Sequence, residues 1–491
     1  MLYIGIDLGT SATKLLLVDE EGNVRGAVTK EYPLSFPRPG WSEQAPAHWW
    51  DACLSGMAEL MRGIDAAEVK GIGVGGQMHG LVALDGSDQV IRPAILWNDG
   101  RTSREVEYLN ETIGRETISK YTANIAFAGF TAPKLLWMRA HEPGLFARIE
   151  KIMLPKDYLV YRLTGIHATD CSDASGMLLL DVEHRRWSQE MCHICEISAA
   201  QLPKIYESWD AVGTLRPDVA EKFGLRTDTV VCAGAGDNAA AAVGTGTVGA
   251  GRCNISLGTS GTIFISSDTF SVDPNNALHS FAHADGGYHL MGCMLSAASC
   301  NKWWQGNIIG TTDYRGEEAN ITRDMLGQNH VYFLPYLMGE RSPINDTDAR
   351  GAFVGMTMDT SRADMTQAML EGVAFAIRDS FEVARRLGIE IPRSNICGGG
   401  SKSRLWRTIV ANVLGIPLDM VATEQGPGYG AAILAMVSTG KFPSVQAACS
   451  ALTITADTLE PDPGLMARYE ERYQQFKQIY PAMKPLFPQL H

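Results

Sequence analysis

Short apolar runs alternate with longer amphipathic stretches along the chain. Near its start, "YIGIDLG" and "KLLLVDEEGNV" are rich in aliphatic residues, and the polar "EEGN" is a turn signal, a pattern typical of a β-meander. "QAPAHWWDACLSGMAELMRG" then has the spacing of an amphipathic helix, and "VKGIGVGGQMHGLVALDG" returns to strand, turn and strand. This alternation of strands and helices predicts an α/β fold.

The pattern restarts near residue 230. "TVVCAGAGDN" predicts a strand that ends in a loop, "AAAAVGTGTVGAG" a helix that gives way to glycines, and "CNISLGTSGTIFISS" a second hairpin. Strong amphipathic helices are predicted further on, in "DMTQAMLEGVAFAIRDSFEVARRLG", "SRLWRTIVANVLG" and "GLMARYEERYQQFKQIYPAMKPL". Because the glycines between Gly244 and Gly251 separate the two patterns, we predict one domain over residues 1–245 and another over 246–491.

Length, charge and cysteine use narrow the class of protein. A chain of 491 residues exceeds what one hydrophobic core usually organises. With 42 Lys and Arg against 55 Asp and Glu, it lacks the basic excess that nucleic-acid binding requires. The opening "MLYIGIDLGT" has no secretory pattern, and no apolar run approaches the ~20 residues of a membrane helix. We therefore expect a cytoplasmic protein with reduced cysteines, no nucleic-acid partner and no membrane span.

A short glycine-containing motif occurs twice. "DLGTSATK" spans residues 7 to 14, and "SLGTSGT" spans residues 256 to 262. Such a turn presents backbone N–H groups and hydroxyls to a phosphate, and glycine allows a close approach, although one copy alone is equally well explained as a tight hairpin. The matched pair predicts two similar domains that face each other across a cleft. Asp7 replaces Ser256 in the first copy, and a carboxylate beside a polyphosphate needs a bridging cation such as Mg²⁺.

Ten motifs, in order from residue 5 to about residue 430, resemble those of the FGGY family of carbohydrate kinases. They are "GIDLGTSATK", "GQMHG", "ILWNDGR", "GFTAPKLLW", "LPKDYL", "GAGDNAAAAVG", "SLGTSGT", "FLPYLMGERSP", "EGVAFAIRDS" and "GGGSKSRLWR". The resemblance implies two actin-like, ribonuclease H-like domains around a deep cleft, with sugar held mainly by the first and ATP mainly by the second. It is closest to members that act on D-xylulose, and it suggests a homodimer.

The resemblance makes Asp237 the catalytic aspartate. The residue lies on a glycine loop between a buried strand and an alanine helix, a rigid position for a group in a cleft. In phosphoryl transfer such a carboxylate accepts the proton of the attacking hydroxyl. The alternative is that Asp237 caps the helix that follows it. Asn238 would hold the sugar or orient the base, and Asp7 with Asp237 would contact Mg²⁺ through water.

Further site residues follow from the same resemblance. His79 could equally be structural and Trp97 ordinary core. Met78 and His79 stand where glycerol kinases carry an Arg-Glu pair, which disfavours glycerol. The sugar contacts implied are Gln77, Met78, His79, Trp97, Asp99, Arg101 and Asn238. The ATP contacts implied are Gly9, Thr10, Ser11, Lys14, Gly258, Thr259, Ser260, Gly398, Gly399, Gly400 and Ser401.

Two other motifs are discounted. "GTGTVG", residues 244 to 249, has the glycine spacing of a dinucleotide fingerprint but follows a helical run instead of a strand. "CHIC", residues 192 to 195, lacks a second ligand pair at zinc-site distance.

The expected activity is transfer of phosphate from ATP, with Mg²⁺, to the terminal hydroxyl of D-xylulose. Another ketopentose or a polyol, such as ribulose, is the alternative within this class, because selectivity depends on a few hydrogen bonds. From another class, an actin- or Hsp70-like ATP-driven binding protein would use the same fold.

Overall fold

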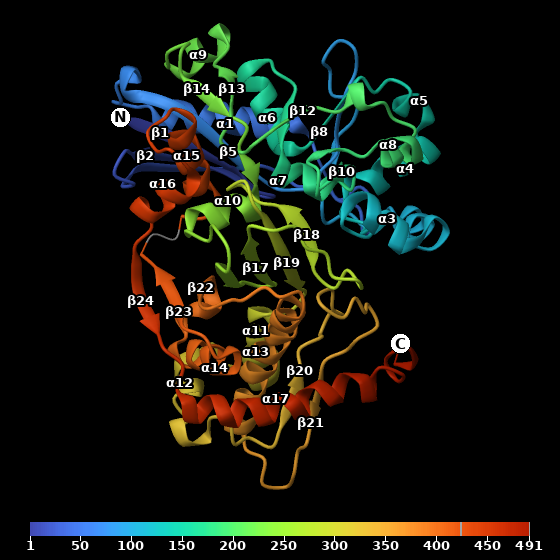
Figure 1. Ribbon diagram of the computed structural model, residues 1–491, viewed down its shortest axis with the longest axis vertical. Helices are drawn as coiled ribbons and strands as arrows, with labels where there is room; N and C mark the ends of the chain where they lie inside the picture. Colours follow the sequence, from blue (N-terminus) through green and yellow to red (C-terminus); the bar gives the residue numbers. More distant parts are fainter. Residues whose placement is uncertain (423–424, 491) are drawn as a thin grey trace.

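In the computed structural model, which describes residues 1–422 and 425–490, the chain forms two lobes, each built on a mixed β-sheet (Figure 1). The first sheet has the order β13-β14-β5-β1-β2-β3, with β15 beside β5. Its strands are β1 (Leu2–Leu8), β2 (Ala12–Asp19), β3 (Val24–Glu31), β5 (Val69–Gly76), β13 (Ala211–Thr214), β14 (Val230–Cys232) and β15 (Ala235–Gly236). The predicted α/β meander is confirmed.

The second sheet has the order β18-β19-β17-β16-β22-β23-β24. Its strands are β16 (Cys253–Leu257), β17 (Gly261–Ser267), β18 (His279–Ala282), β19 (Tyr288–Met294), β22 (Ser394–Cys397), β23 (Leu418–Val421) and β24 (Thr455–Leu459). Short strands outside the two sheets are β4 (Glu43–Gln44), β6 (Val82–Leu84), β7 (Ala94–Ile95), β8 (Lys151–Met153), β9 (Ala168–Asp170), β10 (Leu180–Asp181), β11 (Arg186–Trp187), β12 (Lys204–Tyr206), β20 (Tyr332–Leu334) and β21 (Ala352–Val354).

The two sheets share one topology. In the first, β1 pairs antiparallel with β2 and parallel with β5, and β5 pairs parallel with β14. In the second, β16 pairs antiparallel with β17 and parallel with β22, and β22 pairs parallel with β23. An antiparallel strand, β13 or β24, closes the corresponding edge of each. The repeated motif therefore forms the central hairpin of each lobe, as expected for two actin-like domains.

The helices lie around these sheets. Those of the first lobe are α1 (Pro46–Leu60), α2 (Ser103–Glu107), α3 (Arg115–Thr122), α4 (Thr131–His141), α5 (Pro143–Phe146), α6 (Pro155–Thr164), α7 (Cys171–Ala174), α8 (Gln189–Cys195), α9 (Pro217–Phe223) and α10 (Asp237–Gly244). Those that follow are α11 (Ala298–Trp303), α12 (Tyr314–Glu318), α13 (Arg362–Arg386), α14 (Arg404–Leu414), α15 (Pro427–Ser438), α16 (Val445–Leu452) and α17 (Pro463–Met483). No helix in the described residues is both long and apolar enough to cross a bilayer.

The longest helix shows how local sequence sets its start. Ser361 precedes α13, and its hydroxyl accepts the backbone N–H of Asp364 at 3.2 Å. The Asp364 carboxylate in turn accepts the backbone N–H of Ser361 at 2.8 Å. This reciprocal cap satisfies two N–H groups that would otherwise lack partners at the helix start.

Helix α15 returns the chain to the first lobe after the second sheet has begun. It packs on β1 and β5 and crosses α10 (Figure 1). A Cβ on Gly5 would collide with the carbonyl oxygen of Gly428, and a Cβ on Gly73 with that of Ala431. The first sheet thus depends on glycines to admit the backbone of α15. The predicted domain division at residues 245 and 246 stays a prediction. The packing shows that α15, which comes late in the sequence, covers the first sheet.

Candidate active site

Asp7, near the end of β1, and Asp237, directly after β15, lie at the same edge of the first sheet, and both strands pair with β5. Strands β1 and β15 both run parallel to β5, where Asp7 pairs with Gly75 and Gly236 pairs with Gly76. Asp237 follows Gly236 directly as the first residue of α10. Because parallel strands end at a common edge, the two carboxyl groups meet there, which is the usual place for a ligand in such sheets.

The pKa values of both acids are raised above the ordinary value of an aspartate. Burial and then the negative charge of Asp7 raise the pKa of Asp237 to about 7, against a smaller opposing effect of the Asn238 backbone N–H. Burial raises the pKa of Asp7 to about 6, although Lys14, its partner across the hairpin, opposes the shift. Such an arrangement favours a proton or a cation between the groups. In the second lobe, Ser256 pairs instead with Thr262.

The structure does not support the helix-cap alternative for Asp237. Gly236 occupies the N-cap position of α10, and no side chain caps that helix. The Asp237 carboxylate accepts the backbone N–H of Asn238 at 2.7 Å and its side-chain N–H at 3.1 Å. Asn238 also donates to the sulfur of Met78 at 3.8 Å, so the predicted base and two predicted sugar contacts lie together.

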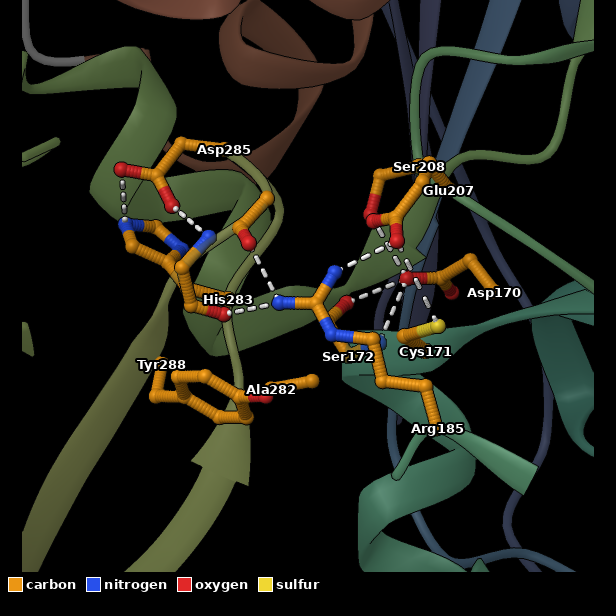
Figure 2. A network of polar contacts seen from close by, with 12 residues as sticks. Asp170, Cys171, Ser172, Arg185, Glu207, Ser208, Ala282, His283, Asp285 and Tyr288 are labelled. Atoms are coloured by element: carbon orange, nitrogen blue, oxygen red, sulfur yellow. Dashed lines mark hydrogen bonds and ion pairs between the residues drawn. The ribbon is translucent and has the colours of Figure 1, made fainter. Parts of the chain in front are cut away.

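A buried polar network holds the backbone before Asp237 (Figure 2). The N–H of Gly236 donates to Oγ of Ser172 at 3.2 Å, and Ser172 donates to Asp170 at 2.5 Å. Ser208 donates to the same oxygen of Asp170 at 2.7 Å. Each donor in this series of hydrogen bonds has an acceptor, and the network therefore fixes the loop that carries Asp237.

Lys156, from the motif "LPKDYL", supports the same loop from beneath. Its Nζ lies 2.8 Å from Asp157 and 3.1 Å from Asp170, and it donates to the carbonyl of Ala233 at 3.0 Å. Burial alone would lower the pKa of Lys156, but the surrounding carboxylates raise it above its ordinary value. Sequence reasoning assigned no role to this lysine, although the motif itself was recognised.

Arg185 joins the lobes next to this network (Figure 2). Its guanidinium contacts the Glu207 carboxylate at 2.5 Å and donates to the carbonyl oxygens of Gly286 and Gly287, in the turn between β18 and β19. In the same turn, Asp285 accepts the N–H of Gly249 at 2.7 Å, within the predicted junction. The junction glycines are therefore tied to a turn of the second sheet.

His79 has the geometry of a neutral hydrogen-bond acceptor. Its ring Nδ1 lies 2.7 Å from the carbonyl oxygen of Gly176, so Nδ1 carries the proton and Nε2 keeps a lone pair. Burial, chiefly, lowers the pKa of the ring to about 3. The backbone of His79 is left-handed, and Lys134 donates to its carbonyl at 2.8 Å. Lys134 belongs to "GFTAPKLLW" and was missed as a supporting residue.

The first repeated turn is braced by residues from the sugar side. Trp97, with 44% of its surface exposed, donates to Oγ1 of Thr10 at 2.9 Å. Thr10 in turn lies 3.4 Å from Oε1 of Gln77. Gln44, in β4, donates to the carbonyl of Thr10 at 2.6 Å and was not predicted, because nothing in the segment "SEQAP" marks it.

Asp99 and Arg101 are buried and bound to each other. Their side chains are fully buried and paired with each other at 2.7 Å. Arg101 also pairs with Glu43 and stacks 3.8 Å over the ring of Trp41. Asp99 also accepts the backbone N–H groups of Ser42 and Arg101, so the pair braces the loop that carries Trp97, and a direct contact with sugar stays a prediction.

The predicted ATP contacts of the second lobe lie side by side. A Cβ on Gly398 would come within 2.8 Å of the backbone of Leu257, just before the turn of Gly258, Thr259 and Ser260. Gly398 also has a positive φ of 86°, and Gly399 faces open space. Ser401 donates to the carbonyl of Gly398 at 2.8 Å.

Gly9, Ser11 and Lys14 lie on the opposite hairpin. There Lys14 donates to Gln425 at 2.8 Å.

The two discounted motifs lie on helix α8 and at the end of helix α10. Cys192 and Cys195 are buried on α8, and no cluster of three or more His, Cys, Asp or Glu suited to a metal occurs among residues 1–422 and 425–490. "GTGTVG" begins at the last residue of α10, so it follows a helix as expected.

Comparison with known proteins gives the same picture over the whole chain. Xylulose kinase from Escherichia coli (strain K12) is 42% identical over 487 residues, 99% of this chain and 100% of that protein. The crystal structure of a xyloylose kinase from Brucella ovis has a TM-score of 0.94 and 41% identity, covering 99% and 100% of the two chains. The gluconate kinase from Lactobacillus acidophilus has the same TM-score at 27% identity, covering 100% and 99%.

Both halves of the chain match one family. Residues 2–244 match the N-terminal domain of the FGGY family of carbohydrate kinases, and residues 253–439 match its C-terminal domain. The order of the motifs, the duplicated sheet and these matches agree. The chain belongs to the FGGY family of carbohydrate kinases.

Proposed function

We propose that this kinase transfers the γ-phosphoryl group of ATP to the terminal hydroxyl of D-xylulose, giving xylulose 5-phosphate and ADP. The observation that carries the proposal is the meeting of Asp7 and Asp237 at the sheet edge, with Met78 in contact with Asn238, the residue after Asp237. The full-length similarity to xylulose kinases supports D-xylulose as the sugar.

Asp237 is the general base in this proposal. As the bond between the sugar oxygen and phosphorus forms and the bond to the ADP oxygen breaks, the hydroxyl proton passes to the Asp237 carboxylate. A pKa of about 7 makes this carboxylate a much stronger base than an ordinary aspartate, while about half of it remains ionised at neutral pH. The N–H groups of Asn238 hold its oxygen in place.

The acids fit an Mg²⁺ ion that arrives with ATP. Their oxygens are the donors that Mg²⁺ prefers, and a cation between them would offset the cost of ionising both carboxyl groups, whose pKa values are raised. Within the described residues there is no three-ligand cluster, so water and phosphate oxygens would complete the shell. When bound, Mg²⁺ neutralises charge on the phosphates. Asp7 is the residue that we assign to this side.

The remaining contacts are shared between the walls of the cleft. His79 offers Nε2 as an acceptor for a sugar hydroxyl, and Trp97 offers an exposed ring. The two glycine turns, at Gly9 and Gly258, present backbone N–H groups to the polyphosphate. A homodimer stays a prediction.

A sugar panel in a coupled ADP-release assay tests the proposal. D-xylulose should have a much higher kcat/KM than glycerol, ribitol or gluconate, and ATP consumption should require the sugar. Equal or better kcat/KM with D-ribulose or L-ribulose would overturn the choice of D-xylulose and keep the kinase class. Sugar-independent ATP hydrolysis would favour an actin-like ATP-driven protein instead.

A further inference from the structure

The segment between β20 and β21 of the second lobe carries an arginine with a fixed backbone. The Glu340 carboxylate accepts the N–H of Arg341 and that of Leu295, each at 2.8 Å. The next residue, Ser342, donates its N–H to the carbonyl of Cys293 at 3.0 Å, at the end of β19. These bonds anchor Arg341 to the second sheet on both sides of its Cα.

The side chain of Arg341 reaches the first lobe. Its guanidinium carbon lies 5.2 Å from the centre of the Phe127 ring. Phe127 lies 5.6 Å from Phe130, and Phe130 lies 4.7 Å from His79, both between ring centres. Two aromatic rings therefore separate the guanidinium from the predicted sugar-binding imidazole.

Arg341 forms no ion pair within 4.0 Å in the part of the chain that the structure describes, although its charge opposes the rise that burial causes in the pKa of Glu340. The side chain is half-buried and hydrogen-bonds to the thiol of Cys293. After burial, its charge is among the effects that lower the pKa of His79 and of His279. Because no carboxylate pairs with it at ion-pair distance, the guanidinium keeps N–H groups that a ligand can accept from.

We propose that Arg341 is a substrate-binding residue that donates to the carbonyl and adjacent hydroxyl of the ketose. Asp237 must face the hydroxyl that is phosphorylated, and Lys14 is the cation beside Asp7. Arg341 lies with His79, so it serves the other end of the sugar. Two parallel N–H groups of a guanidinium match the two oxygens of an α-hydroxyketone. This inference rests on the proposed function and names the group that separates ketoses from polyols.

The position of Arg341 also makes the sugar site an interlobe site. His79 and Phe127 come from the first lobe, whereas Arg341 is anchored to β19 of the second. Sugar binding would therefore depend on how the two lobes are placed, in addition to the residues of the first lobe.

The test compares Arg341→Gln and Arg341→Lys with the wild type on D-xylulose and on xylitol, which lacks the carbonyl. For Arg341→Gln, KM for D-xylulose should rise about 10- to 100-fold because charge-assisted hydrogen bonds are lost. KM for ATP should be nearly unchanged. The preference for D-xylulose over xylitol should shrink. Arg341→Lys should recover part of the loss. Arg323→Gln, at a surface arginine paired with Asp462, is the matched control and should match the wild type.

Two results would overturn the assignment. One is a KM for D-xylulose in Arg341→Gln within twofold of the wild type. The other is a loss confined to kcat or to KM for ATP, which would place Arg341 on the phosphoryl group. Should Arg341→Gln fail to fold, a wild-type KM in Arg341→Lys would refute the proposal in the same way. The wild-type measurement tests the proposed function separately, because it does not depend on either variant.

Discussion

Replacing Asp237 by asparagine separates the chemistry of the site from its binding and from its stability. The amide is nearly isosteric with the carboxyl group and keeps one oxygen acceptor for the N–H groups of Asn238. It cannot accept the hydroxyl proton. We therefore expect both ligands to bind while turnover falls by ~10²–10⁴, which is what a positioned proton acceptor contributes.

The same change should stabilise the protein by an amount that grows with pH. The pKa of Asp237 is about 7 in the folded chain, against 3.8 as its ordinary value. Below pH 3.8 the group is protonated in both states and contributes no penalty. Between pH 3.8 and 7 the unfolded chain ionises while the folded chain resists. Above pH 7 the folded state carries the full penalty of about 4 kcal/mol.

Thermal unfolding at pH 4.5 and pH 8, beside the rate measurement, is the assay. Removing the penalty should raise Tm of Asp237→Asn at pH 8 by roughly 4 °C for a chain of this length, and by much less at pH 4.5. Asp218→Asn, an exposed carboxylate paired with Arg216, is the control that should show neither the rate loss nor this pH-dependent gain.

Two outcomes would refute the reasoning. Near-native turnover of Asp237→Asn would mean that another group accepts the proton. A change in Tm that is the same at both pH values would mean that burial and Asp7 do not raise the pKa of this carboxyl group.

Further predictions concern Asp7, the cleft and the helix crossing. Asp7→Asn should lower the pKa of Asp237 and move the acid limb of the rate profile to lower pH, with activity partly restored by raised Mg²⁺; an unshifted limb contradicts the coupling. Small-angle scattering with sugar and a non-hydrolysable ATP analogue should show a smaller radius of gyration, and an unchanged radius argues against closure. Gly430→Ala should lower Tm strongly, because its Cβ would strike the carbonyl of Ala240 on α10, whereas Gly144→Ala, in open space, should not.

The sequence pattern predicted those helices, strands and turns that depend mainly on residues close together in the sequence. The alternating apolar positions of "YIGIDLG" and the capped run of α13 specify their elements almost alone, and the repeat of the glycine turn indicated a duplicated sheet. Asp7 was predicted because it stands where the second copy of the turn has Ser256, and Asp237 because its motif resembles that of the family; both lie in short local patterns that the sequence makes recognisable.

Contacts between distant segments left no such signal. Nothing near Gln44 or Arg341 in the sequence says that one reaches Thr10 and the other Phe127. At Arg101 the resemblance predicted a sugar contact, and the fold adds that its side chain is buried against Asp99, so the direct contact stays a prediction. A charged residue in a motif can serve either the substrate or the loop that meets it, and only the three-dimensional arrangement distinguishes the two.

The seating of α15 on the first sheet has a consequence for biosynthesis. Strands β1 and β5 are complete once residue 76 has been made, but the helix that covers their glycines begins at Pro427. During translation this face of the nascent sheet would remain uncovered for some 350 residues, which takes about 18–70 s at ~5–20 residues per second. Separate expression of residues 1–245 would leave the same face bare, so we expect that fragment to aggregate, and adding residues 425–452 in trans should restore its solubility.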